Sequence, residues 1–313
     1  MKIRILAAIL LATLLCGCAN TAAPAVTESD TAVGFVDDLG RAVTVCQPRR
    51  VAALLGSFAE VWTLSGGTVC AAPEDAWDDF ALELPDAVHI GGAHSPSLEL
   101  LLSADPDFVI ASASTASNVA LQETLEASGI PVAYFDVDNF DDYLRMLDIC
   151  TDITGRKDLF EQNGTALARQ IDELKERVSD AQLPEEQRTG LLLRAASGFV
   201  KAKGSEGTIL GEMLADLDCI NIADSDTSLL ETLSVESVIR QNPYRIFVVT
   251  MGNDTQKAQD NLDQMVRENP AWETLEAVQQ ERLYIMDRKL FNIKPNARWA
   301  ESYEILTEIL LDA

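Results

Sequence analysis

The fold is decided by a segment that occurs twice, LELLLSADPDFVI at residues 98–110 and VESVIRQNPYRIF at residues 235–247. In each copy a Glu, Glu99 or Glu236, stands in the opening turn of a short amphipathic helix, and a Pro follows it. The apolar run after the Pro reads as a buried strand. The Glu pair (236 minus 99) and the Pro pair (243 minus 106) are both 137 residues apart. This spacing indicates one domain-sized unit used twice.

Short apolar strands alternate with helices around the first copy. The pattern predicts a hairpin at residues 34–36 and 42–45, then strands near 51–55, 68–72, 88–90, 108–112 and 132–135. Ser57 and Glu60 have the spacing of a capping box, at the start of the helix that follows the strand near residues 51–55. Such alternation is typical of a mostly parallel, doubly wound sheet.

A helical pattern fills residues 140–179 and breaks only at Thr154-Gly155. Beyond it, strands are expected from residue 190 and at 246–250 and 283–286, with helices at 234–241, 257–268 and 297–311. We therefore predict an α/β fold with two doubly wound lobes, residues 34–155 and 183–313. One long rigid helix at 156–182 joins them, and a ligand cleft lies between them.

The first residues have the features of an export signal. Lys2 and Arg4 precede an apolar stretch at residues 5–15, which is too short to span a bilayer and predicts a signal peptide over residues 1–17. The ending Leu15-Cys16-Gly17-Cys18 resembles the lipobox of bacterial lipoproteins, which implies cleavage before Cys18 and acylation of its sulfur. The alternative is an ordinary secretory signal with two incidental thiols. Residues 18–33 are small, polar and aperiodic, as in a flexible tether.

The composition excludes several partners. The chain has 24 Lys and Arg against 50 Asp and Glu, a formal charge of −26, which repels nucleic acid and anionic headgroups. Its remaining cysteines, Cys46, Cys70, Cys150 and Cys219, form no Cys-x-x-Cys pair, so a zinc ribbon or redox motif is not expected. Their apolar neighbours favour buried free thiols over disulfides, although an exported protein could form either.

Several short motifs together resemble one family of transport proteins. They are GRAVTV at residues 40–45, PRRV at 48–51, PSLE at 96–99, PDFVI at 106–110 and SVE at 234–236. With two lobes and one linking helix, they resemble the substrate-binding proteins of ABC importers, in the branch that captures ferric siderophores, haem and cobalamin. The resemblance implies a monomer, lipid-anchored on the extracytoplasmic side of the cell membrane.

The resemblance also implies a role for the repeated glutamates. Glu99 and Glu236 would each dock on a basic pocket of one subunit of the permease dimer, which works with its ATPase. The alternative is that each carboxylate only stabilises the N-terminus of its helix. That alternative explains each Glu singly, but not one at the same place in both copies.

The ligand is expected beyond the carboxyl ends of the strands, where open α/β sheets bind their ligands. In the second lobe these ends are rich in basic residues, which predicts an anionic ligand. Part of this set could instead be exposed charges that cover apolar surface. The expected ligand-binding residues are Trp77, Arg194, Lys201, Arg288, Phe291, Lys294 and Arg298.

Metal coordination and catalysis have little support in the sequence. His94 could reach the cleft and ligate haem iron, but a surface-loop histidine is the alternative, and no His, Asp and Glu cluster has metal-ligand spacing. The chain lacks the GxGxxG and GxSxG motifs of common enzymes. We expect a binding protein without a cofactor that captures an iron complex, a ferric siderophore or alternatively haem or cobalamin. A surface interaction protein or an enzyme on the same two-lobe fold is the competing class.

Overall fold

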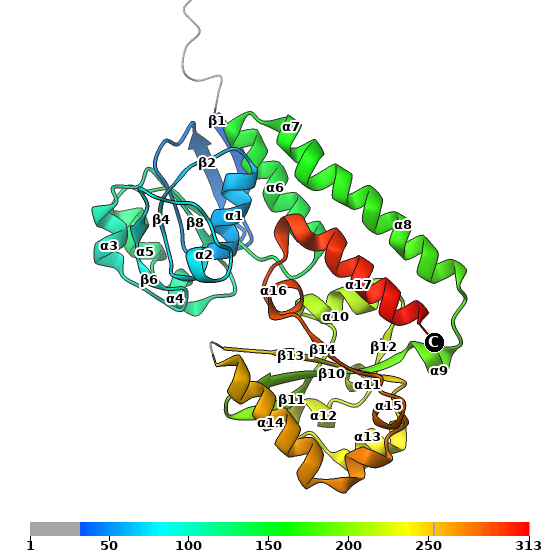
Figure 1. Cartoon of the computed structure of the whole chain (residues 1–313). Helices are drawn as coiled ribbons and strands as arrows, with labels where there is room; N and C mark the ends of the chain where they lie inside the picture. The colour runs from blue at the N-terminus through cyan, green and yellow to red at the C-terminus, as the bar shows by residue number, and fades with distance from the viewer. Residues whose placement is uncertain (1–31, 253, 313) are drawn as a thin grey trace, which may run out of the picture. The chain divides into compact units, whose positions relative to one another are not determined.

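A parallel five-stranded sheet forms the centre of the first lobe in the computed structural model, which describes residues 32–252 and 254–312 (Figure 1). Its strand order is β5-β4-β3-β8-β9, and every neighbouring pair is parallel. The strands are β3 (Val51–Ala53), β4 (Val69–Ala72), β5 (Val88–His89), β8 (Phe108–Ser112) and β9 (Val132–Phe135). The helices are α1 (Gly56–Leu64), α2 (Asp75–Asp78), α3 (Leu98–Ser103), α4 (Ala116–Val119) and α5 (Gln122–Ala127). Apolar side chains on both faces of β8 and β9 explain why these strands are fully buried.

Two antiparallel hairpins flank this sheet, β1 (Ala32–Val36) with β2 (Ala42–Cys46) and β6 (Gly91–Gly92) with β7 (Ser95–Pro96). Arg41 of the GRAVTV motif holds the first hairpin in place. Its Nη2 donates to Asp37 Oδ2 at 2.6 Å and to the Val132 carbonyl at 2.8 Å. The arginine therefore ties the hairpin to strand β9.

The second lobe has a mixed five-stranded sheet. Its order is β11-β10-β13-β14, with β12 beside the start of β10. The strands are β10 (Thr189–Ala196), β11 (Phe199–Lys203), β12 (Ile220–Asn221), β13 (Arg245–Thr250) and β14 (Leu283–Met286). Strand β11 runs antiparallel to β10, whereas the other pairs are parallel. Arg194 and Lys201, which were expected beyond the carboxyl end of a strand, therefore lie within a β-hairpin.

Short helices cover this sheet and lead to the C-terminus. They are α9 (Glu185–Arg188), α10 (Ile209–Asp216), α11 (Ile222–Ser225), α12 (Ser228–Glu231), α13 (Val235–Gln241), α14 (Thr255–Glu268), η3 (Pro270–Thr274), α15 (Glu276–Gln279), α16 (Arg288–Phe291), η4 (Asn296–Arg298) and α17 (Trp299–Leu311).

A helical run connects the two sheets. Helix α6 (Phe140–Thr154) ends at Gly155, whose left-handed backbone, φ 70°, suits a glycine. Then α7 (Lys157–Phe160), a π-helical turn at Glu161–Thr165 and α8 (Ala166–Asp180) follow without a break. Helix α8 packs alongside α17 (Figure 1) and buries Ile171, Leu174 and Val178. The helix expected over this stretch is present, and it is braced by the C-terminal helix.

The two copies of the repeated segment have the same local geometry. Ser97 caps α3 with φ −80° and ψ 112°, and Ser234 caps α13 with φ −84° and ψ 113°. Each hydroxyl accepts a backbone N–H at 3.3 Å. Asp105 and Asn242, 137 positions apart, are both left-handed, with φ 49° and 44°. The duplication therefore extends to backbone geometry.

Two local expectations are wrong. Helix α1 begins at Gly56 with no side-chain cap, so Ser57 and Glu60 form no capping box. Glu60 instead accepts a hydrogen bond of 2.7 Å from Asn296 Nδ2. Cys46 is exposed rather than buried, whereas Cys150 is buried as expected. Free thiols are found at Cys70, Cys150 and Cys219.

The expected signal peptide (residues 1–17), Cys18 and nearly all of the expected tether lie outside the described residues. Within residues 32–252 and 254–312, no helix is both long and apolar enough to cross a bilayer.

Candidate functional site

A cavity of about 730 Å³ opens between the β10–β11 hairpin and the loop that leads into α10. Strand β10 contributes Arg194, β11 contributes Lys203, and residues 204–208 form one wall. Helices α11 and α12 add Asp224 and Leu230. The cavity lies at the carboxyl end of β10, where open α/β sheets hold their ligands.

Three basic side chains meet on one face of this hairpin. Arg194 pairs in register with Lys201, and Lys203 lies two residues further along β11. Directly opposed residues in an antiparallel pair share a face, and like charges there repel each other. Burial lowers the pKa of Arg194. It also lowers the pKa of Lys203, and the charges of Arg194 and Lys201 add to that shift.

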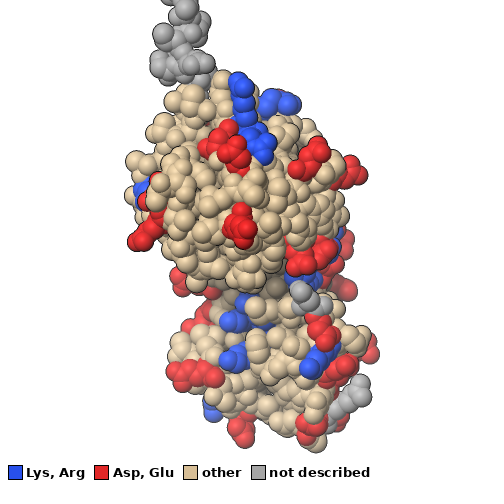
Figure 2. Space-filling view, turned by 90° about the vertical axis from the view of Figure 1, so that its left-hand side faces the viewer, with Lys and Arg blue, Asp and Glu red and all other residues tan. Residues whose placement is uncertain are grey.

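This basic cluster has no compensating carboxylate. Among the described residues, none of the three side chains forms an ion pair, and the buried Nε of Arg194 has no hydrogen-bond partner. Lys201 lies over the Phe199 ring, 5.3 Å from its centroid. Figure 2 shows both basic and acidic side chains around the hollow in this face of the molecule. An anion would relieve both the repulsion and the unpaired donor.

Of the three acidic residues of the cavity wall, Glu206 is exposed, and Asp224 and Glu212 hold the loop. Asp224 Oδ1 accepts the Ser205 N–H at 2.8 Å, and Glu212 Oε1 accepts the Gly207 N–H at 3.0 Å. Gly211 permits the close packing, because a Cβ there would lie 2.3 Å from Thr208 Oγ1 and 2.4 Å from the Ser205 carbonyl oxygen. The loop is therefore preformed. The sequence carried only a weak signal for it, a glycine-rich turn before an apolar run.

Two of the expected ligand residues lie near carboxylates of the first lobe. Arg288 forms a bidentate ion pair with Asp79, at 2.6 and 3.0 Å. This hydrogen-bonded pairing raises the pKa of Arg288. Burial lowers the pKa of Lys294, and the charges of Asp138, Asp136 and then Asp142 oppose the shift. Neither cation lines the cavity around Arg194.

The remaining expected ligand residues are dispersed. Phe291 is 2% exposed and belongs to the core, so it offers a ligand no surface. Arg298 pairs with Glu301 at 2.6 Å and lines a separate groove between α8 and α17. Trp77 is half-buried and stacks on His89, with ring centroids 4.6 Å apart. The structure therefore does not bring Phe291 and Arg298 together with Arg194 in one cavity.

His94 is exposed in the turn of the β6–β7 hairpin. No cluster of three or more metal-ligating side chains occurs within the part of the chain that the structure describes.

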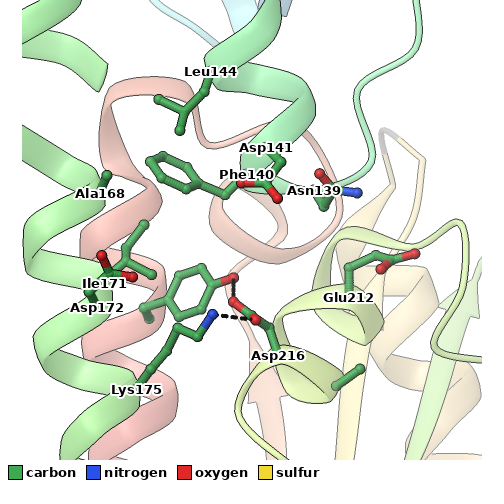
Figure 3. Close-up of a pocket in the computed structure, with 12 residues that line it drawn as sticks. Asn139, Phe140, Asp141, Leu144, Ala168, Ile171, Asp172, Lys175, Glu212 and Asp216 are labelled. Atoms are coloured by element: carbon green, nitrogen blue, oxygen red, sulfur yellow. Dashed lines mark hydrogen bonds and ion pairs between the residues drawn. The ribbon is translucent and has the colours of Figure 1, made fainter. Parts of the chain in front are cut away.

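A second cavity, of about 420 Å³, lies where α6, α8, α10 and α17 meet (Figure 3). Lys175 forms an ion pair of 2.6 Å with Asp216 Oδ1, and the Tyr303 hydroxyl donates to Asp216 Oδ2 at 2.8 Å. Burial, reinforced by the charge of Asp216, raises the pKa of Tyr303. None of the expected ligand residues lines this cavity, and its one cation is already paired. It is a junction between helices rather than a second basic site.

The repeated glutamates lie outside both cavities. Glu99 and Glu236 are exposed in the first turns of α3 and α13. No salt bridge holds either side chain within residues 32–252 and 254–312, although Ser234 Oγ lies 3.3 Å from Glu236 Oε2.

Comparison with known proteins agrees with this architecture. The chain is 25% identical over 300 residues to the Fe(3+)-citrate-binding protein YfmC of Bacillus subtilis (strain 168), covering 91% of this chain and 89% of the relative. Staphylococcus aureus SirA complexed with staphyloferrin B superimposes with a TM-score of 0.67 at 19% identity, covering 89% of this chain and 97% of SirA. S. aureus IsdE complexed with heme superimposes with a TM-score of 0.68 at 14% identity, covering 85% of this chain and 99% of IsdE.

The two solved structures share the fold of two lobes linked by a helix. A model of a family of binding proteins, described as Periplasmic binding protein, matches residues 51–290, which is most of the chain. The chain therefore belongs to the periplasmic binding protein family.

Proposed function

We propose that this protein captures an anionic iron complex, a ferric siderophore or ferric citrate, and delivers it to an ABC importer. The observation that carries the proposal is the uncompensated cluster of Arg194, Lys201 and Lys203 beside a preformed cavity. Guanidinium and ammonium groups without counter-charges favour carboxylate or catecholate oxygens. The similarity to a protein named for ferric citrate supports this ligand class.

The ligand would carry its own iron donors. The described residues supply no metal-ligating cluster, so recognition falls on the oxygens of the chelator rather than on the metal. Haem is the second candidate, because the fold is shared with IsdE complexed with heme and His94 is exposed. A corrinoid is a further alternative in the same type of importer.

Delivery requires contact with the membrane. We propose an extracytoplasmic monomer anchored through acylated Cys18, which lies outside the described residues. Glu99 and Glu236 would dock on the permease dimer, which works with its ATPase. Both carboxylates are exposed, and no salt bridge within residues 32–252 and 254–312 neutralises either of them. This supports the docking role.

The test is a fluorescence titration of the purified protein with ferric citrate, ferric siderophores, haem and cobalamin. Arg194→Gln or Lys203→Gln should weaken binding of an anionic chelate about ten- to a hundredfold, because each removes a charge-assisted contact of about 1.5–3 kcal/mol. Arg194→Gln should also raise the melting temperature of the ligand-free protein, since it removes an unpaired, partly buried charge.

Arg298→Gln is the matched control, because Arg298 is paired with Glu301 in another groove. It should leave affinity within twofold. Tight binding of cobalamin or haem that neither Arg194→Gln nor Lys203→Gln alters would contradict the anionic-chelate proposal.

A further inference from the structure

The duplicated helices share an exposed apolar residue as well as a glutamate. Leu102 in α3 and Ile239 in α13 are 137 positions apart, and both are 37% exposed. Each stands three residues after its glutamate, so acid and aliphatic side chain lie on the same face of the helix. The neighbouring Leu101 and Val238 are both 0% exposed. One side of each helix is thus anchored in its lobe, and the other presents an acid with an aliphatic side chain. Helix α3 exposes Leu100 as well, whose counterpart Ser237 is buried.

The backbone orients both pairs in the same way. The caps at Ser97 and Ser234 have matching dihedral angles, and each helix is followed by a left-handed residue. Strands β8 and β13, which follow the two helices, begin at residues 108 and 245, again 137 apart. Each pair therefore has the same place relative to the sheet of its lobe. Both side chains stay partly exposed, so burial in the core alone does not account for an aliphatic residue at this place in both copies.

We propose that each lobe carries a two-part docking element, Glu99 with Leu102 and Glu236 with Ile239. The partner it fits is a two-fold symmetric membrane protein that offers, on each subunit, a basic residue beside an apolar recess. Two equivalent elements on one chain match two equivalent sockets, which a symmetric dimer provides. This inference rests on the proposed importer function and adds the apolar half of the contact.

The two halves make different contributions. The carboxylates attract a basic socket over distance. At 0.1 M ionic strength, salt largely screens that attraction between charges more than about 10 Å apart. The aliphatic side chains contribute by burial, which moderate salt does not weaken. Salt dependence therefore separates the acid from the aliphatic part.

The experiment measures binding of the full chain, without ligand, to its importer in proteoliposomes by biolayer interferometry at 50 and 500 mM NaCl. Leu102→Gln and Ile239→Gln should each weaken binding about three- to tenfold at both salt concentrations. Glu99→Lys with Glu236→Lys should weaken it most at low salt. Matched controls are Leu39→Gln and Ile220→Gln, at residues 37% and 38% exposed and outside the repeated helices.

Binding of Leu102→Gln and Ile239→Gln that equals that of the two controls would overturn the proposal. A ferric citrate titration of the same variants keeps the two proposals apart, because both residues lie outside the basic cavity. Unchanged chelate affinity with weakened importer binding supports the docking element. A wild-type protein that binds its importer but no iron complex would overturn the proposed ligand and leave the docking result valid.

Discussion

At the scale of single residues, Gly56 shows how the absence of a side chain sets the position of a helix. It begins α1 directly after the buried apolar run at residues 51–55, and its N–H donates to Asp75 Oδ2 at 2.9 Å. A Cβ at Gly56 would lie 2.5 Å from the Ala76 backbone nitrogen. Only glycine lets α2 approach this closely. Because α2 carries Trp77 and is capped by Asp79, the same contact positions the first-lobe side of the interlobe contact.

Gly56→Ala should lower the free energy of unfolding by about 1–3 kcal/mol, because rigid backbone rather than a flexible side chain must shift. The measurement is urea denaturation followed by circular dichroism. Gly34→Ala is the control, since its added Cβ would meet only Thr44 Oγ1 at 3.9 Å. Equal effects of the two substitutions would show that α2 can move away at little cost.

At the scale of elements, the segment from α16 to η4 contacts the first lobe. Arg288 pairs with Asp79, the Lys289 ammonium donates to the Asp78 carbonyl at 3.3 Å, and Asn296 donates to the Ser57 carbonyl at 2.9 Å. The Arg288 and Asp79 side chains are only 20% and 18% exposed, so the pair is shielded from solvent. We interpret this segment as a contact that holds the two lobes together rather than as a wall of the ligand site.

A double-mutant cycle at Asp79 and Arg288 tests this contact between the lobes. Asp79→Asn and Arg288→Gln should each destabilise the protein, and the coupling energy from urea denaturation should be about 1–3 kcal/mol. Affinity for ferric citrate should stay within twofold in Arg288→Gln, unlike Arg194→Gln. A large loss of affinity in Arg288→Gln would mean that the ion pair opens when ligand binds, as the sequence-based expectation for Arg288 requires.

At the scale of the whole molecule, the duplication would let one chain serve the symmetric partner that we propose. Both lobes place the capped helix immediately before a central strand, β8 or β13, so their exposed glutamates are structural equivalents. The linking helices and α17 share one core with residues of both lobes. Such a connection favours limited motion between the lobes.

The proposed anchor is tested on the intact chain in its cell. Cys18→Ala should release the protein from the membrane fraction, because no acyl chain would then hold it, whereas Cys16→Ala should leave it membrane-bound. Fractionation followed by immunoblotting and mass spectrometry of the N-terminal peptide makes the measurement. Wild-type protein that is fully soluble, with an unmodified N-terminus at Ala19, would show that the segment is an ordinary secretory signal.

The duplication, the two α/β lobes, the linking helix and the family could all be predicted from the amino-acid sequence. Strands at residues 108–112 and 132–135 were predictable because buried strands require continuous apolar runs. Helix caps at Ser97 and Ser234 were predictable because they depend on a few adjacent residues.

Only the tertiary structure decided which charges are available to a ligand. Arg194, Lys201, Arg288 and Arg298 look alike in the sequence, yet Arg288 is neutralised by Asp79, 209 residues away, and Arg298 by Glu301. Strand β11 was also hidden, because its alternating lysines resemble a polar loop until β10 pairs with it. The Arg288–Asp79 ion pair joins residues that are distant along the chain, so local patterns do not specify it.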